Sequence, residues 1–166
     1  MEIRQITEDD AAAFLAMQRQ LDRETDFMLM APGERQTTVE QQRDIIHKIL
    51  SDGRSMIWVV ADGERLVGAL TLRALAPRKI RHTGHLVVGI LAANRGQGVG
   101  TELFRHMEAW ALAHAFHRLE LTVICENRIA LNLYLKQGFL VEGLRRDSIR
   151  QPDGHWVHEY AMSKLL

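Results

Sequence analysis

Asn94-Arg95-Gly96-Gln97-Gly98-Val99-Gly100-Thr101 is the stretch that decides the fold of this sequence. The residues before it, 84–91, are mostly β-branched and aliphatic, which is typical of a buried strand. The residues after it repeat at helical spacing, with an apolar stripe formed by Val99, Leu103, Met107 and Trp110. The glycines therefore lie at a predicted strand-to-helix junction.

A junction of this composition predicts a site for an anion. The first turn of a helix has backbone N–H groups without intrahelical partners, and the helix dipole adds positive potential there. Glycine leaves these N–H groups uncovered and tolerates the positive φ of a tight turn. We interpret the stretch as a pyrophosphate-binding turn. The alternative is a flexible turn in front of an ordinary surface helix.

Three glycine-rich anion loops compete for this stretch. A Walker A loop needs a lysine before its serine or threonine, but Gly100 precedes Thr101 here. A dinucleotide fingerprint, G-x-G-x-x-G, lacks its last glycine, although Glu120 follows at about the distance of a ribose-binding acid. The pattern R-x-x-G-x-G is matched by Arg95, Gly98 and Gly100. It resembles the coenzyme A pyrophosphate loop of the GNAT superfamily of N-acetyltransferases.

A second motif follows at a suitable distance. After a strand-like run at residues 119–125 come Asn127, Ala130 and Tyr134, and then Gly138-Phe139. This spacing resembles the N-x-x-A-x-x-x-Y and Gly-Phe pattern of the same superfamily. Asn127 is also expected to cap the helix, and Gly138 to end it in a left-handed conformation. The resemblance covers roughly residues 84–140, whereas residues 1–80 agree only in the order of elements.

The composition bounds the class of protein. The 166 residues are 46% hydrophobic and 25% charged, with a formal net charge of zero, so we expect one globular domain over residues 1–166. Interleaved acids and bases predict neither a nucleic-acid nor a membrane partner. Because Cys125 is the only cysteine, an internal disulfide is excluded. The start lacks a signal-like apolar region, which makes a cytoplasmic location the expectation.

The order of predicted elements favours the GNAT fold over a Rossmann domain. A short strand at residues 1–6 and a helix from Ala11 come first, followed by a second helix capped by Thr38. Paired strands at residues 56–61 and 66–72 precede the strand before the glycine loop, whereas a dinucleotide fingerprint normally follows a first strand. The fold class expected is α/β of the α+β type, with a mixed, mostly antiparallel twisted sheet flanked by helices.

Two further segments complete the expected fold. The irregular residues 22–36 contain the apolar run Phe27-Met28-Leu29-Met30, which either packs on the core or forms a lid over an acceptor site. Residues 139–150 and 155–165 are predicted to pair around a turn at residues 151–154. Family habit, rather than these residues, suggests a homodimer through the edge of this last hairpin.

The resemblance implies an acetyl-CoA-dependent N-acetyltransferase that works by direct attack in a ternary complex. Tyr134 matches the tyrosine that reaches the sulfur of coenzyme A and gives the departing thiolate a proton. A backbone N–H of Ile90 or Leu91 would polarise the acetyl carbonyl. Gly89 is expected to allow a strand irregularity that frees backbone groups for the pantetheine arm.

The group that takes the amine proton is left open. His85 falls where relatives often place a glutamate, and a histidine titrates near neutrality, but a strand histidine is also a common structural residue. His82, Glu24 and Glu34 are further candidates, and ordered water is another.

The remaining expectations concern the cofactor and the acceptor. The N–H groups of the loop would bind the pyrophosphate; its residues are Arg95, Gly96, Gln97, Gly98, Val99, Gly100 and Thr101. Asn127 would hold the pantetheine, while Arg128 and Lys136 either meet nucleotide phosphates or are solvated charges. No metal is expected. The acceptor would be a primary amine of a small molecule or a peptide N-terminus. The alternatives are a noncatalytic acyl-CoA-binding module of the same fold and a dinucleotide-binding domain.

Overall fold

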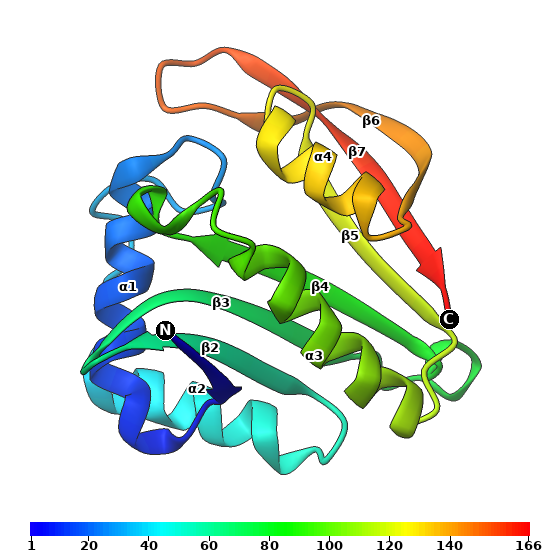
Figure 1. Cartoon of the computed structure of the whole chain (residues 1–166). Helices are drawn as coiled ribbons and strands as arrows, with labels where there is room; N and C mark the ends of the chain where they lie inside the picture. Colours follow the sequence, from blue (N-terminus) through cyan, green and yellow to red (C-terminus); the bar gives the residue numbers. More distant parts are fainter.

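The computed structural model describes residues 1–166, which form a seven-stranded sheet flanked by α-helices (Figure 1). The strand order is β1-β2-β3-β4-β5-β7-β6. The strands are β1 (Glu2–Gln5), β2 (Met56–Asp62), β3 (Arg65–Ala74), β4 (Thr83–Ile90), β5 (Arg118–Ile124), β6 (Leu140–Arg150) and β7 (Trp156–Leu165). The α-helices are α1 (Ala11–Glu24), α2 (Val39–Ser51), α3 (Val99–Ala113) and α4 (Arg128–Lys136). The expected mixed α/β fold class is thereby confirmed.

The sheet divides where β4 meets β5. This pair is parallel and covers only three residues of each strand, the last of which are His85 and Glu120. All other neighbouring strands are antiparallel. Beyond His85 the two strands diverge, and Figure 1 shows β5, β6, β7 and α4 leaning away from the rest of the sheet. The fold therefore has a split that begins at a defined residue.

The β3–β4 ladder runs without a break up to the glycine loop. Its register is continuous from Ala74 opposite Gly84 to Gly68 opposite Ile90. The prediction of a strand irregularity at Gly89 is therefore wrong. An added Cβ at Gly89 would lie 2.7 Å from Cδ1 of Leu21, so the glycine is needed because α1 packs so close to β4.

The helices cover opposite faces of the sheet. Gly89 faces Leu21 of α1, and the next residue, Ile90, faces α3 at Gly100. Since successive strand residues point to opposite faces, α1 and α3 lie on opposite sides of β4. Helix α4 shares the α3 face, because an added Cβ at Gly100 would lie 2.7 Å from Cδ2 of Leu133. Both faces of the sheet are thus covered near the split.

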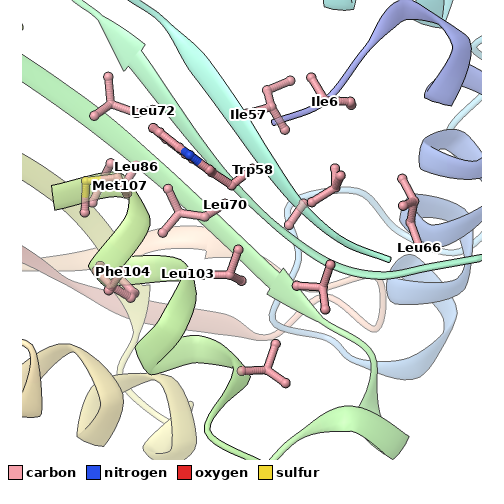
Figure 2. Packing of buried hydrophobic residues seen from close by; sticks show 14 of the residues in the cluster. Ile6, Ile57, Trp58, Leu66, Leu70, Leu72, Leu86, Leu103, Phe104 and Met107 are labelled. Carbon is pink, nitrogen blue, oxygen red and sulfur yellow. The ribbon is translucent and has the colours of Figure 1, made fainter. Parts of the chain in front are cut away.

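The main core lies between α3 and the central strands. Trp58 of β2 meets Trp110 of α3 edge to face, with ring centroids 5.8 Å apart. Figure 2 shows Leu70 and Leu103 packed in the same layer, with Phe104 at its edge. Leu86 and Leu91 of the aliphatic run before the loop belong to the same cluster as Leu103, so the strand and the helix on either side of the loop share one core.

Local signals place the element ends close to where the sequence predicts them. Thr38 accepts a hydrogen bond from the Gln41 N–H as part of a capping box that begins α2. Asn127 caps α4, and Gly138 follows that helix at a φ of +87°. None of the helices combines the length and the apolar character needed to cross a membrane.

Candidate active site

A cavity of about 590 Å³ lies in the split between β4 and β5. Its walls come from β4 (His85 through Ile90), the end of β5, the first turns of α4 and the loop that follows α1, with one residue each from α1, β6 and β7. The predicted site residues that line it are His85, Ile90, Arg95, Asn127 and Tyr134. The structure thus brings together residues from both sequence motifs.

The cavity reaches both faces of the sheet. Because α4 lies on the α3 face, Tyr134 enters from that side. On the other face, register places His85 beside Glu120, and Ile124 opposite Glu159 of β7. Residue 85 lies on the same face of β4 as Gly89, which faces α1. Residue 124 lies on the same face of β5 as residue 120, so Glu159, which is opposite residue 124, is on the α1 side of the sheet. The cavity lining therefore comes from both faces of the sheet.

The glycine loop presents unpaired N–H groups at the start of α3. The Arg95 N–H donates to the Ala92 carbonyl, and the first helical bond runs from Glu102 to Gly98. Between these two bonds, no backbone carbonyl accepts from the N–H groups of residues 96–101. Gly96 and Gly98 have φ values of +74° and +79°, and an added Cβ at either would meet open space. An anion can reach these groups.

The third glycine of the loop has a packing role and does not border the open space beside Gly96 and Gly98. Gly100 faces Leu133 rather than the open side of the loop, so it allows α3 and α4 to touch. The sequence pattern does not distinguish this packing role from that of Gly96 and Gly98.

Arg95 joins the loop to the end of β4. Its Nε donates to the Ile90 carbonyl at 2.9 Å, so the side chain holds the strand end instead of extending freely toward solvent. The Leu91 N–H donates to the Val67 carbonyl at 2.9 Å and is not free for a ligand. Because hydrogen-bonding directions alternate along an antiparallel ladder, the Ile90 N–H points away from β3 and into the split.

Tyr134 is an acid without a partner in the protein. Burial alone raises the pKa of its phenol from 10.0 to about 12, and no charged or hydrogen-bonding group shifts it further. The ring packs edge to face on Phe104, with centroids 5.9 Å apart. The phenol is therefore neutral near pH 7, and its proton is available to a group that enters the cavity.

Asn127 combines two roles that the sequence leaves as alternatives. Its Oδ1 accepts a hydrogen bond from the Ala130 N–H at 3.2 Å, which caps α4. Its Nδ2 has no partner in the protein, and the residue lines the cavity. The helix cap therefore leaves an amide donor available to a ligand.

The candidate bases are not equally placed. His85 lines the cavity, but at the closed end of the split, five residues before Ile90. Burial alone would raise the pKa of Glu24, but hydrogen bonds from the Ala92 N–H and the Gln20 side chain hold it below its usual value. Glu24 is thus a poor base and instead holds the strand end. His82 and Glu34 do not line the cavity.

The loop after α1 forms an outer wall of the cavity. Phe27, Met28 and Leu29 line the cavity, and Leu29 is 84% exposed. The buried Asp22 anchors the loop by accepting two hydrogen bonds from Arg35, at 2.8 and 3.0 Å. The loop therefore lines the cavity, and its role as a lid over an acceptor site stays a prediction.

Sequence reasoning missed two acidic residues of the cavity, Glu126 and Glu159. Glu126 lies just before the asparagine motif and lines the cavity. Glu159 is 8% exposed and shares the phase of the buried Val157 along β7. An acid at an inward position of an alternating strand is a signal that could have identified it. No group of three or more His, Cys, Asp or Glu side chains is placed to hold a metal ion.

Comparisons with known proteins match one family over most of the chain. The acetyltransferase (GNAT) family matches residues 16–139. A mycothiol acetyltransferase of Jonesia denitrificans is 34% identical over 108 residues, which cover 65% of this chain and 33% of that protein. The chain thus spans about a third of the length of that curated relative.

Solved structures share the fold over nearly the whole chain. An acetyltransferase of the GNAT family from Streptococcus pneumoniae has a TM-score of 0.95 at 28% identity, covering 99% of both chains. A phosphinothricin acetyltransferase from Sinorhizobium meliloti, solved in complex with AcCoA, has a TM-score of 0.86 at 17% identity. The structural match covers 99% of this chain and 88% of that acetyltransferase.

Proposed function

This chain belongs to the acetyltransferase (GNAT) family, and we propose that it transfers an acetyl group from acetyl-CoA to a primary amine. The acceptor is a small molecule or a peptide N-terminus, and the amine attacks directly in a ternary complex. The observation that carries this proposal is the cavity in the β4–β5 split, which has an uncharged phenol on one face and an open approach on the other.

The residues present fit acetyl-CoA. The free N–H groups at the start of α3 suit a pyrophosphate, because they combine unpaired donors with the positive end of the helix dipole. Asn127 Nδ2 and the strand end at Ile90 suit the amide-rich pantetheine arm. Arg128 lines the cavity next to Asn127 and suits a phosphate. When bound there, acetyl-CoA supplies the thioester whose carbonyl carbon is attacked.

Three residues around the cavity then have defined roles in the transfer. The Ile90 N–H donates to the acetyl oxygen as negative charge develops on it. The amine nitrogen forms a bond to the carbonyl carbon, and the bond from that carbon to sulfur breaks. Tyr134 gives its proton to the departing sulfur and regains one from solvent. His85 on the cavity wall is the candidate acceptor of the proton that the amine loses, and it takes this proton directly or through water.

The two alternatives are less well supported. A noncatalytic acyl-CoA-binding module would not need a phenol without a protein partner in the cavity, yet Tyr134 is one. A dinucleotide-binding domain of the Rossmann type would have a parallel sheet, whereas this sheet contains only one parallel pair.

Release of free thiol from acetyl-CoA in the presence of primary amines tests the proposal. We expect release that depends on both the amine and the enzyme, with the acetylated amine detected by mass spectrometry. The proposal fails if acetyl-CoA binds and no amine or peptide N-terminus is acetylated. Failure to bind acetyl-CoA would contradict it at an earlier step.

A further inference from the structure

We propose that Glu159 binds the ammonium group of the acceptor, and that this acceptor is an amine with an apolar body and no carboxylate. This inference rests on the proposed acetyl transfer and adds the chemical class of the second substrate. It assigns a substrate-binding residue on β7, outside both sequence motifs.

Glu159 is a carboxylate whose pairing is incomplete. Its side chain is 10% exposed, and its one charged partner is Arg145 of β6, whose Nη1 lies 3.2 Å from Oε2. The side chain of Arg145 is 55% exposed, so solvent competes for the guanidinium. The other carboxylate oxygen, Oε1, has no partner in the protein. Because a buried carboxylate is costly unless it is paired, a cation in the cavity would stabilise it.

The position of Glu159 suits the attacking amine. It lies opposite Ile124, four residues beyond Glu120, where β4 and β5 last pair. It is therefore in the open part of the split, whereas His85 is at the closed end. Glu159 lines the same cavity as Tyr134 but from the other face of the sheet. An amine held there would approach the acetyl group from the side opposite the phenol.

The surrounding surface defines the rest of the acceptor. Phe27, Met28 and Leu29 form an apolar wall on this side of the cavity. The second acid of the cavity, Glu126, also lines an adjoining pocket of about 290 Å³ that contains Asp26 and Asp153. His155 of that pocket is already paired with Asp153. With Asp153 engaged in that pair, Glu126 and Asp26 are the acids that favour a cation and repel an acceptor carboxylate.

A matched pair of acceptors tests the substrate class. We expect the wild-type enzyme to acetylate 2-phenylethylamine with a kcat/KM about ten-fold or more above that for L-phenylalanine, which differs by one carboxylate. A kcat/KM for L-phenylalanine equal to or above that for 2-phenylethylamine would overturn the proposed class of acceptor. So would a wild-type enzyme that binds acetyl-CoA but does not acetylate 2-phenylethylamine.

A matched pair of variants tests the residue. In Glu159→Gln we expect the KM for 2-phenylethylamine to rise about ten-fold or more, since the neutral amide oxygen can still accept a hydrogen bond but no longer pairs with the charge of the ammonium group. The dissociation constant of acetyl-CoA should stay within about two-fold, because Glu159 lies on the other face. In Arg145→Gln the same KM should be unchanged or lower, since the carboxylate loses only a solvated partner.

The two variants separate binding from a structural role. If Glu159 acts only by pairing with Arg145, both variants will change KM equally, and the assignment of Glu159 is wrong. An unchanged KM in Glu159→Gln would also overturn it. These outcomes differ from failure of the proposed function, in which the wild-type enzyme would not bind acetyl-CoA or would acetylate no amine or peptide N-terminus.

Discussion

Tyr134 is the residue on which the proposed chemistry depends most. Its hydroxyl has no partner in the protein, so Tyr134→Phe removes a proton donor without leaving an unpaired group behind. We expect kcat to fall by about 100-fold or more, with little change in the affinity for acetyl-CoA. Thiol-release kinetics and calorimetric titration would measure the two effects. A large loss of affinity would show instead that Tyr134 shapes the binding site.

Burial of the same phenol predicts a pH dependence of stability. The folded protein raises the pKa from 10.0 to about 12, so it favours the neutral form more than the unfolded chain does. This contribution to stability is complete below pH 10.0 and is lost as the pH rises toward 12. Denaturant unfolding of wild type and Tyr134→Phe between these values should therefore show a shallower decline in the variant. Parallel curves would contradict the burial of the phenol.

Gly98 tests the anion site at the scale of one residue. Its φ of +79° is unfavourable for alanine, at a cost of about 1–2 kcal/mol, although the space around an added Cβ is open. Gly63, in the β2–β3 turn, has a φ of +61° and equally open surroundings, so Gly63→Ala is a matched control. We expect similar losses of stability, but weaker acetyl-CoA binding only in Gly98→Ala. Equal affinities in the two variants would argue against the loop as the pyrophosphate site.

At the scale of elements, the contact between α3 and α4 positions the site. The two helices touch at Gly100 and Leu133, and Leu133 directly precedes Tyr134. A displaced α4 would move the phenol relative to the split. The glycine motif and the asparagine motif are therefore coupled by packing as well as by a shared ligand.

Gly100→Ala tests this coupling. The added methyl would lie 2.7 Å from Leu133 Cδ2, so we expect a loss of about 1–3 kcal/mol in the free energy of unfolding. Adding Leu133→Ala to Gly100→Ala removes the overlap. The double variant should therefore lose less stability than the sum of the losses in the two single variants. Thermal or denaturant unfolding of the four proteins would measure this. Strict additivity would mean that the helices do not meet there.

Element boundaries were predictable because their signals are local. Thr38 and Asn127 cap their helices through side chains three residues from the groups they bind, and Gly138 ends α4 by its own conformation. The glycine at position 89 was attributed to a strand irregularity, whereas it is required by the close packing of Leu21. This contact could not be predicted because the two residues are far apart in the chain. A glycine in a sequence does not tell a bulge from a close approach.

At the scale of the whole molecule, the site results from a sheet that divides. Both motifs could be recognised because each depends on spacing within one segment of the chain, and the fold class followed from the resemblance and from the order of the predicted elements. The cavity could not, because it depends on where β4 and β5 stop pairing. Alternation along β7 could have marked Glu159 as an inward-facing acid, but not as a residue of the cavity. Its place beside the cavity follows from the registers of β5 with β4 and with β7, which no local pattern encodes.

The shift in the thermal unfolding midpoint with acetyl-CoA, and with NAD as the control, tests the central claim most directly. Acetyl-CoA at about 100 times its dissociation constant should stabilise the fold by about 2.7 kcal/mol. For a chain of this size that corresponds to a rise of about 5–10 °C. We expect this rise with acetyl-CoA and none with NAD. No shift with acetyl-CoA, or a shift with NAD alone, would contradict the proposal that the split and the glycine loop form an acetyl-CoA site.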